Sequence, residues 1–441
     1  MKRREFITKT LTAGAAIAAL PILPALSGEA PQTPISTQKS TPSPSKFTAD
    51  ELQARYEKLD EALRRPIFRK ELFPDPVIID TLELLELDGR YLCRVRSKDG
   101  AEGISVGHGS TGPFARIMRG QVIPFFIGQD ARELDALVEW IFMYRLNFRL
   151  NGMAIGLPLA TIEFAIIDMM GKISGKSAAD LIGGMRNPEI GLYYATELRQ
   201  LPLDEHFRRI QEEVSEFDVR ALKIKVGFMW DGNRDIHYKG IPGKSEKLIP
   251  MVRDRYPDWA LYADANGYYS ADEAIRIGRI LEEHRFGYFE EPVFFDNFEE
   301  VKKVADALSI PIANGEQDQN FYNYRWLLAH DGLDIVEPDA YYFGGFIRSM
   351  RVALMADAVG KKCLTHMSGG SLGYLYNSLL VSALPNPTPH HEFKGFGTHV
   401  PFECPTSPLT LNASMMKVPT GPGLGVTIDP TYIAKYKPIN N

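Results

Sequence analysis

The sequence predicts an α/β fold in which an eight-stranded parallel β/α barrel follows a smaller α+β domain. After residue 190, eight short apolar segments alternate with polar segments of helix length, a pattern typical of parallel β/α units. Before that point, two-residue alternation gives way to helical periodicity. Eight such units close naturally into a barrel. An open doubly wound sheet is the alternative, but no glycine-rich phosphate loop follows the first strand.

The first 46 residues are set apart from this fold. The paired arginines of "MKRREFI" precede a stretch without charge, "TLTAGAAIAALPILPALSG". A basic start followed by a short apolar run indicates a signal segment over residues 1–28, and the paired arginines favour the twin-arginine export route. Residues 29–46 are rich in Pro, Ser and Thr and are typical of a flexible tether. We therefore expect a periplasmic or otherwise extracytoplasmic protein, with a retained membrane anchor as the alternative.

Residues 47–189 are expected to form the α+β domain. A short amphipathic helix, "FTADELQARYEKLDEALRR", comes first. Residues 77–109 then alternate apolar and polar, with Asp-Gly at 88–89 and 99–100, which predicts a three-stranded antiparallel meander. From 131 to 183 the periodicity is helical. Outside the signal segment no apolar run approaches the length of a membrane span, so we expect no membrane contact after processing.

Residues 190–395 are expected to form the barrel, and the proline-containing tail 396–441 to pack back on the α+β domain. The helices between the strands include "DEHFRRIQEEVSEF", "SADEAIRIGRILEEH", "NFEEVKKVADAL" and "GFIRSMRVALMADAVG". The eight predicted strands are "IGLYYAT", "ALKIKV", "ALYADAN", "FGYFEEP", "IPIANGE", "LDIVEPDA", "KCLTHM" and "HHEF".

Composition excludes several classes of partner. The formal charge of −6 and the pI near 5.9 leave no clustered basic face of the kind that nucleic acid requires. Three scattered cysteines are too few for a disulfide framework or a zinc motif.

Three consecutive predicted strands end in carboxylates, Asp264, Glu290 and Glu316, about 26 residues apart. Barrel enzymes carry their chemistry at these strand ends. Converging carboxylates repel one another unless a cation lies among them, and oxygen-only ligands favour a hard ion such as Mg²⁺. The alternative is that each carboxylate caps the helix after its strand. Glu291 is interpreted as either structural or a supporting residue of the site, and Asn266 as a supporting residue.

The second strand carries Lys223 and Lys225, whose side chains leave the strand on the same face. A divalent ion and a neighbouring ammonium both disfavour the charged form of a lysine, so the pKa of one lysine should fall and make it a general base. The other lysine, kept cationic by the carboxylates, can stabilise developing negative charge. The alternative is a solvated edge strand whose lysines pair with surface acids.

His366 ends the seventh strand, and Asp339 ends the sixth beside it. A carboxylate within reach of an imidazole fixes its tautomer and raises its basicity. A lysine on one face, a His–Asp pair on the other and a metal ion suit removal of a proton next to a carboxylate, which gives an enediolate. His108, His390 and His391 are left without an assigned role.

At these residues the chain resembles the enolase superfamily, in particular its mandelate racemase-like subgroup. The resemblance extends from about residue 75 to 440. It is carried by the motifs "AIIDMMGKISGKSAADLIGG", "KIK", "DAN", "EEP", "GE", "PDAYYFGG" and "LTHM". It implies a modified TIM barrel of (β/α)7β type, an α+β capping domain, a Mg²⁺ cofactor and a symmetric homo-oligomer.

The resemblance also implies roles for single residues. Asp264, Glu290 and Glu316 would bind the metal ion, with Lys225 as the base on one face of the substrate. His366 would act on the other face, oriented by Asp339, while Lys223 would hold the enolate and Glu392 would hydrogen-bond the substrate carboxylate. A lysine on strand six marks the muconate cycloisomerase branch, so Asp339 there disfavours that branch. Tyr341 and Tyr342 depart from the pattern that the family shows after this aspartate, which leaves specificity open.

We therefore predict an enzyme that removes the proton α to a carboxylate of a small molecule, with dehydration of an acid sugar as the first hypothesis. Racemisation or epimerisation of a 2-hydroxy acid needs the same residues. Two other classes stay open: a carbohydrate-acid binding protein without turnover, and a barrel hydrolase that uses metal-bound water and histidine ligands.

Overall fold

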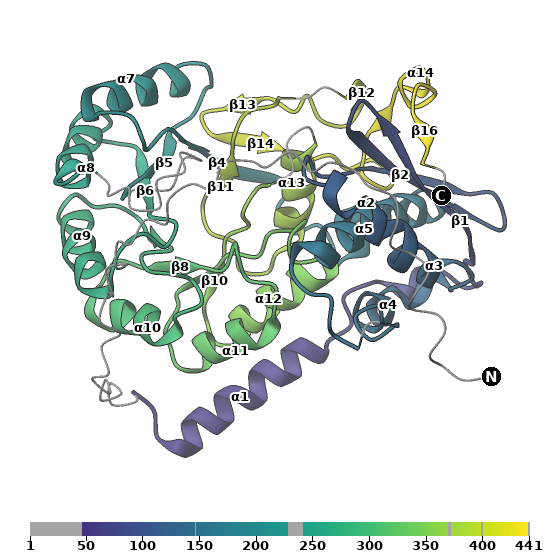
Figure 1. Cartoon of the computed structure of the whole chain (residues 1–441), viewed down its shortest axis with the longest axis horizontal. Coiled ribbons are helices and arrows are strands. Elements are labelled where there is room, and N and C mark those ends of the chain that lie inside the picture. The colour runs from purple at the N-terminus through teal and green to yellow at the C-terminus, as the bar shows by residue number, and fades with distance from the viewer. Residues whose placement is uncertain (1–45, 146, 228–240, 369–371, 398–399, 440–441) are drawn as a thin grey trace, which may run out of the picture. The chain divides into compact units, whose positions relative to one another are not determined.

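The computed structural model describes residues 46–145, 147–227, 241–368, 372–397 and 400–439 (Figure 1). The predicted signal segment and nearly all of the predicted tether lie outside the described residues. The described residues belong to one compact unit.

The capping domain is built on the predicted antiparallel meander. It consists of β1 (Ile79–Leu87), β2 (Arg90–Ser97) and β3 (Glu102–Val106), and β16 (Lys437–Pro438) adds a fourth strand beside β1. Asp88 and Gly89 have φ values of 50° and 75°, the left-handed conformations that a two-residue hairpin requires. The prediction of the meander is confirmed, and the fourth strand comes from the far end of the chain.

A long helix, α5 (Met153–Ser174), crosses β3 and β2 and forms the core of the capping domain. It is long and apolar enough to cross a membrane, so the expectation that only the signal segment has such a run was wrong. Within the apolar window 89% of the helix is buried in the protein, because the helix packs on the sheet on one side and on the barrel on the other. Its apolar surface is core surface.

The other elements before the barrel are α-helices and short helical turns, the latter labelled η. They are α1 (Ala49–Arg64), η1 (Lys70–Leu72), η2 (Gly112–Phe114), α2 (Ala115–Ile117), η3 (Met118–Val122), α3 (Ile123–Phe126), η4 (Ala131–Glu133), α4 (Leu134–Trp140) and α6 (Ala178–Leu181). The first of these was expected within the α+β domain. It packs instead on two barrel helices, α11 and α12, where Arg55 donates to two backbone carbonyls at the end of α11 and Asp60 pairs with Arg325.

Eight parallel strands alternate with seven helices and form the (β/α)7β barrel, so the predicted fold class is confirmed. The strands are β4 (Glu189–Ala195), β5 (Ala221–Lys225), β6 (Ala260–Asp264), β7 (Phe289–Glu290), β8 (Ile312–Asn314), β9 (Ile335–Val336), β10 (Lys362–Cys363) and β11 (His391–Phe393). Strands β4 to β10 pair in chain order, and β11 pairs with β4. A single parallel bridge between Cys363 and Pro387 joins β10 to the segment that leads into β11.

The barrel helices cover the outside of the strands (Figure 1). They are α7 (Leu203–Val214), α8 (Lys244–Arg255), α9 (Ala271–Glu283), α10 (Phe298–Ala307), α11 (Phe321–Ala329), α12 (Phe346–Ala358) and α13 (Gly373–Ala383). Each of α7, α9 and α10 has an apolar face on the barrel and a charged face in solvent, as their 3.6-residue periodicity predicts.

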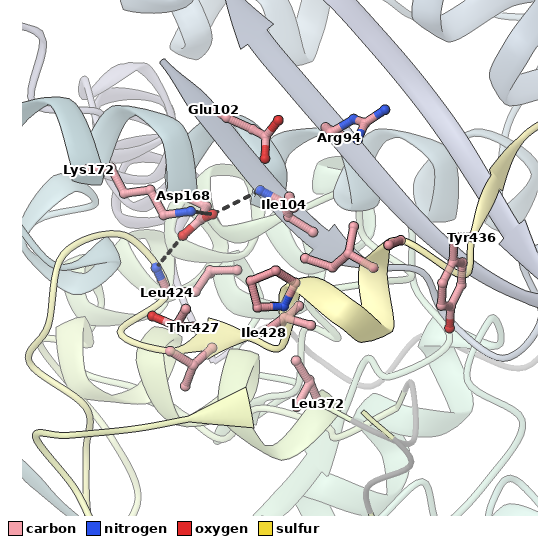
Figure 2. A pocket seen from close by; sticks show the side chains of 14 residues that line it. Arg94, Glu102, Ile104, Asp168, Lys172, Leu372, Leu424, Thr427, Ile428 and Tyr436 are labelled. Carbon is pink, nitrogen blue, oxygen red and sulfur yellow. Dashed lines mark hydrogen bonds and ion pairs between the residues drawn. The ribbon is translucent and has the colours of Figure 1, made fainter. Parts of the chain in front are cut away.

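The C-terminal segment packs on the capping domain, as the sequence predicted, and also on the barrel. It contains β12 (Phe402–Glu403), β13 (Leu411–Asn412), β14 (Met415–Lys417), β15 (Thr427–Ile428), α14 (Pro430–Ile433) and β16. Strand β14 pairs antiparallel with barrel strand β4. Nearer the end, buried Asp168 of α5 accepts hydrogen bonds from the backbone of Ile104 and Leu424, which fastens the segment to the cap (Figure 2). Residues of β3, α5 and this segment line a pocket of about 510 Å³ that contains none of the residues predicted for the active site.

A close approach of backbone to backbone at Gly103 predicts a loss of stability. A Cβ there would overlap the carbonyl oxygen of Ala165 and the backbone of Met169 on α5. Gly103→Ala must therefore push α5 off β3, and we expect a loss of about 1–3 kcal/mol or more, measured as a lower midpoint of thermal unfolding. The control is Gly120→Ala, where nothing lies within 4 Å of the new Cβ. Equal midpoints for the two variants would contradict this packing.

His206 on α7 predicts a dependence of stability on pH. Its side chain is fully buried, and burial, together with the positive charge of Lys244, lowers the pKa of His206 to about 4. Between about pH 6.5 and pH 4 the imidazole is protonated in the unfolded chain but not in the folded one. The free energy of unfolding therefore falls as the pH drops through this range. In His206→Leu this part of the pH dependence, up to about 3 kcal/mol, should be absent in urea unfolding curves. The control is His284→Leu, a partly exposed histidine at the end of α9; an unchanged pH profile in His206→Leu would refute the prediction.

Candidate active site

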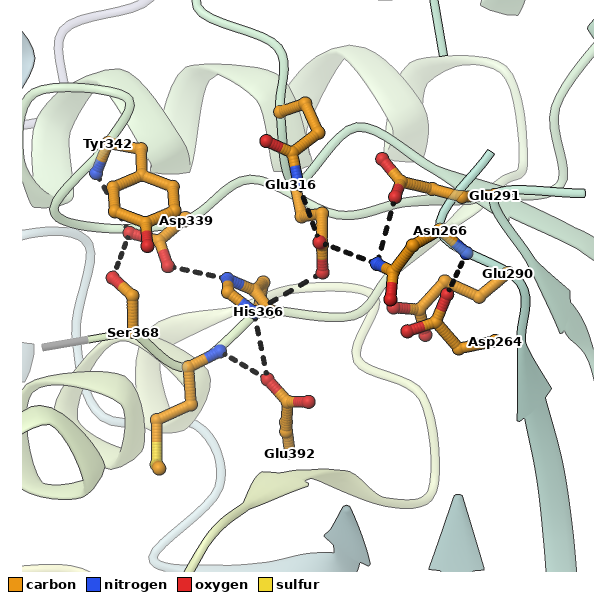
Figure 3. A network of polar contacts seen from close by, with 12 residues as sticks. Asp264, Asn266, Glu290, Glu291, Glu316, Asp339, Tyr342, His366, Ser368 and Glu392 are labelled. Carbon is orange, nitrogen blue, oxygen red and sulfur yellow. Dashed lines mark hydrogen bonds and ion pairs between the residues drawn. The ribbon is translucent and has the colours of Figure 1, made fainter. Parts of the chain in front are cut away.

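The strand ends of the barrel bring the eight predicted site residues together. Figure 3 shows the carboxylates and His366 of this set. Lys225, Asp264 and Glu290 occupy the last positions of β5, β6 and β7 and are neighbours in the sheet register. The other predicted residues lie on β5, on β11 or in the turns after β8, β9 and β10, and are Lys223, Glu392, Glu316, Asp339 and His366. Because parallel strands end at one edge, residues scattered along the sequence meet in one place.

The three predicted metal ligands form a buried cluster. Asp264, Glu290 and Glu316 each offer a carboxylate oxygen, and these oxygens lie within 4.8 Å of one another. All three side chains are buried, so the helix-capping alternative, which needs exposed helix starts, does not describe them. The donor set contains only oxygen, and among the described residues no histidine or cysteine joins it. Such a set fits a hard divalent ion.

The two lysines are buried in contact with this cluster, which excludes a solvated edge strand. Lys223 donates to both oxygens of Glu290 at 2.7 Å, and its Nζ lies 3.1 Å from Glu392 Oε1 and 5.1 Å from the centre of the Tyr193 ring. Burial works against its charge, but Glu290 and Glu392 outweigh burial and raise the pKa of Lys223 well above its usual range. Lys223 is therefore the lysine that stays cationic, as predicted for one member of the pair.

Lys225 lies nearer the mouth of the barrel. Its Nζ contacts Asp264 Oδ2 and lies 3.0 Å from Asn266 Oδ1. Arg199, from the loop after β4, also donates to Asn266 Oδ1 and to the Ala265 carbonyl. The Asn266 amide donates in turn to Glu291 and Glu316, at 3.2 and 3.1 Å. The amide oxygen is thus held toward cations and its nitrogen toward carboxylates.

His366 and Asp339 form the predicted pair. His366 Nδ1 lies 2.7 Å from Asp339 Oδ2, and the other oxygen of Asp339 accepts from the backbone of Tyr341 and Tyr342 and from the Ser368 hydroxyl. These donors, with His366, lower the pKa of Asp339 against the effect of burial, so Asp339 is an anion that accepts the Nδ1 proton. His366 Nε2 is then the atom that can exchange a proton with a substrate.

His366 Nε2 faces two carboxylates, Glu316 Oε2 at 3.2 Å and Glu392 Oε2 at 3.3 Å. Burial disfavours the imidazolium, but these carboxylates and Asp339 prevail and raise the pKa of His366 to about 9. With this pKa His366 is protonated at neutral pH and is an acid. That is the form needed to give a proton to a leaving group.

Glu392 is surrounded by protein donors. It accepts from the backbone of Met367 at 2.8 Å and lies near Lys223, His366 and Lys394. Burial favours its neutral form, but the lysines and His366 lower the pKa of Glu392 well below its usual range. The predicted hydrogen bond from Glu392 to a substrate carboxylate needs a protonated Glu392. Lys223, His366 and Lys394 instead stabilise the carboxylate anion.

A cavity of about 460 Å³ opens above these groups. Its lining includes the predicted Lys225, Glu316 and His366, together with residues that the sequence did not single out. These are Met153, Glu197, Phe294, Phe295, Gln317 and Lys394. Lys394 could have been found by the rule of alternation, since it follows Glu392 by two positions. Nothing in the local sequence marks Glu197 or Arg199.

The three histidines without an assigned role lie in different places. His108, in the capping domain, is buried with its ring against the rings of Tyr341 and Tyr342, and Tyr342 lines the cavity. His390 and His391 contact Tyr262 and Thr365 in the barrel wall and do not line the cavity. Of the three, only His108 reaches the site, through tyrosine.

Comparisons with family models, with characterised proteins and with solved structures all indicate the same family. Residues 205–432 match the family model described as enolase C-terminal domain-like, and residues 90–183 match the mandelate racemase / muconate lactonizing enzyme N-terminal domain. The chain is 27% identical to D-galactarolactone cycloisomerase of Agrobacterium fabrum over 78% of this chain and 90% of that protein. It is 25% identical to arabinonate dehydratase of Saccharolobus solfataricus, over 71% and 81%. A mandelate racemase/muconate lactonizing protein from Paracoccus denitrificans, crystallised with magnesium, superposes with a TM-score of 0.70 at 25% identity, over 82% of this chain and 99% of that one.

A (β/α)7β barrel with an α+β cap and a buried acidic triad at its strand ends defines a class of enzymes that act on small carboxylates. The chain belongs to the enolase superfamily, within its mandelate racemase / muconate lactonizing enzyme group. As an enzyme it is a lyase or a racemase of that superfamily.

The contact between Asp339 and His366 predicts that loss of Asp339 impairs proton transfer by His366 and not by Lys225. In Asp339→Asn the imidazole loses the anion that fixes its Nδ1 proton, and we expect turnover to fall about 10- to 100-fold. Exchange of the substrate α-proton with solvent, measured by NMR in D₂O, should persist on the face served by Lys225. The control is Asp357→Asn, an exposed aspartate of α12. Equal loss of exchange on both faces would contradict separate roles for the two sides.

Proposed function

We propose that this enzyme removes the proton α to the carboxylate of an acid sugar and then expels the β-hydroxide, and is therefore an acid-sugar dehydratase. One observation carries the proposal: Lys225, at the end of β5, and His366, in the turn after β10, line one cavity beside a buried acidic triad. A base and an acid that flank the same space can take a proton from one carbon and give one to the oxygen that leaves the next.

Each residue of the site has its own task in this reaction. Lys225 takes the α-proton, and Lys223, held cationic by Glu290 and Glu392, stabilises the negative charge that appears on the substrate carboxylate. His366 Nε2 gives its proton to the departing hydroxyl, and Asp339 keeps the imidazole in the required tautomer. Asn266, fixed by Arg199, presents a polar group beside Lys225.

We propose Mg²⁺ as the ion of the acidic triad. The fit rests on three buried carboxylates with oxygen atoms close enough to share one ion, and on the solved relative that is described as a magnesium complex. Asp264, Glu290 and Glu316 would hold the ion, which when bound would supply positive charge to the oxygens of the enediolate. A zinc-dependent hydrolase is disfavoured, because histidine or cysteine ligands are absent from the triad among the described residues.

The relatives support dehydration without excluding racemisation. Proteins 25–27% identical to this chain are named dehydratases of arabinonate, D-gluconate and D-xylonate. Another, from Thermus thermophilus, is named N-succinylamino acid racemase. A racemase would use Lys225 and His366 on opposite faces of the same carbon, so it stays the second candidate.

The location and the assembly of the enzyme are also proposals. The paired arginines and apolar run of residues 1–28 support export by the twin-arginine route to the periplasm or beyond. The family resemblance supports a symmetric homo-oligomer.

The reaction can be read directly from a panel of acid sugars incubated with enzyme and Mg²⁺ in D₂O. Dehydration predicts a 2-keto-3-deoxy acid, detected by NMR and by a carbonyl reagent, and racemisation predicts deuterium at the α-carbon with no keto product. Lys225→Ala and His366→Asn should each lower the rate by at least about 100-fold. A protein that binds acid sugars equally well in both variants, with no turnover in the wild type, would be a binding protein instead.

The metal assignment has a readout that does not depend on turnover. Glu316→Gln removes one anionic ligand from the triad, so calorimetric titration with MgCl₂ should show at least about tenfold weaker binding. Glu283→Gln, an exposed glutamate at the end of α9, is the matched control and should bind as the wild type does. Full occupancy by zinc in the purified enzyme, or Mg²⁺ affinity that Glu316→Gln leaves unchanged, would refute the assignment.

A further inference from the structure

We propose that Lys394 and Glu197 together bind the hydroxyl chain of the substrate, and that the substrate is a monocarboxylic sugar acid rather than a diacid. We call these two residues the polyol pair. The inference rests on the proposed function, since it names the part of the acid sugar that this side of the cavity would recognise.

The topology of the barrel places the polyol pair across the cavity from the acidic triad. Lys394 follows β11 directly, and Glu197 lies two residues after β4, its parallel neighbour. In a ring of eight strands, β4 lies opposite β8 and β11 lies opposite β7, the strands that supply Glu316 and Glu290. Strands β5 and β10, which carry Lys225 and His366, stand between the two sides. A substrate whose carboxylate lies at the triad therefore passes between the acid and the base and ends at the polyol pair.

Lys394 has hydrogen-bonding capacity to spare. Its Nζ lies 3.7 Å from Glu197 Oε1 and 3.5 Å from Glu392 Oε1, both longer than a good charge-assisted hydrogen bond. Among the described residues the ammonium makes no hydrogen bond, although it carries three donors. Its side chain is 30% exposed and lines the cavity. Lys223 differs at each point, because it is buried and contacts three carboxylate oxygens at 2.7–3.1 Å.

Glu197 completes the pair with an acceptor. Its side chain is 51% exposed and faces the same cavity. A donor and an acceptor 3.7 Å apart suit two neighbouring hydroxyls: the ammonium donates to one oxygen, and the carboxylate accepts the proton of the other. A second substrate carboxylate would meet Glu197 as a like charge. This is why the pair favours a neutral polyol chain over a distal acid group.

Apolar residues of the same cavity suit the same ligand. Phe294, Phe295 and Met153 line it together with the polar groups. Apolar surface of this kind contacts the C–H groups of a sugar chain, while the hydroxyls bond to placed polar groups such as the polyol pair. The cavity therefore offers a polyhydroxy chain both kinds of surface.

The test compares two variants on substrates that differ only in the chain. Lys394→Met and Glu197→Gln are assayed with a panel of five- and six-carbon aldonates and with glycerate, which has the α- and β-hydroxyls but no further chain. We expect kcat/KM for the aldonate that turns over to fall about 10- to 100-fold in both variants, mainly through KM. For glycerate kcat/KM should change less than twofold. Lys362→Met and Glu283→Gln, both exposed and outside the cavity, are the matched controls.

Three outcomes would overturn the polyol pair. Equal loss with aldonate and glycerate would mean that the residues only support the fold of the site. Wild-type preference for six-carbon diacids, abolished by Lys394→Met and increased by Glu197→Gln, would mean that Lys394 binds a distal carboxylate. Unchanged aldonate kinetics in both variants would mean no contact.

A binding measurement separates this inference from the proposed reaction. Calorimetric titration of the Mg²⁺-loaded enzyme with the same aldonates and with glycerate reports affinity without turnover. Aldonate binding that both variants weaken, in an enzyme that dehydrates none of them, would leave the polyol pair intact and refute the dehydratase. An absence of aldonate binding in the wild type would overturn the pair as well.

Discussion

The active-site region depends on the neutralisation of buried carboxylates by buried cations. Five of them, Asp264, Glu290, Glu316, Asp339 and Glu392, converge at one end of the barrel, where each would be costly to ionise alone. Lys223, Lys225 and His366 each contact at least one of the five. Two carboxyls nearby, Glu291 and Glu337, form no ion pair with a described residue, and burial raises the pKa of each well above its usual range. Lys223 opposes the same effect of burial at Glu290, whose pKa burial still raises, so the cations offset the cost of burial only in part.

The pairing of buried carboxylates with buried cations explains why the two lysines of β5 differ in their contacts. Lys223 lies deep and contacts three carboxylate oxygens, so its proton is held by the protein. Lys225, one alternation nearer the mouth, contacts Asp264 and Asn266 and lines the cavity. Lys225 is therefore the lysine of this strand that a molecule in the cavity can meet, while Lys223 stays in contact with protein carboxylates.

The sequence predicted those features that repeat or that sit at strand ends. Alternation of apolar and polar segments indicated the barrel, and the residues that close its strands indicated Asp264, Glu290, Glu316 and His366. The contacts of α1 with α11 and α12, and of β14 with β4, carry no period and join segments far apart in the chain. Arg199 and Glu197 lie in a loop, where the direction of a side chain follows from tertiary packing and not from alternation. For this reason the residues at strand ends were predictable, whereas Arg199 and Glu197 were not.

The choice between dehydration and racemisation follows from the substrate more than from the reacting groups. In the proposed mechanism both reactions begin when Lys225 takes the α-proton, and both leave His366 facing the same intermediate. If the neighbouring carbon carries a hydroxyl within reach of His366 Nε2, the proton of the imidazolium goes to that oxygen and water leaves. If it carries none, the same proton can return only to the α-carbon, from the opposite face. A cavity that binds a polyhydroxy chain across the barrel supplies a β-hydroxyl with every substrate it accepts, so recognition of the chain and loss of water become one property of the site.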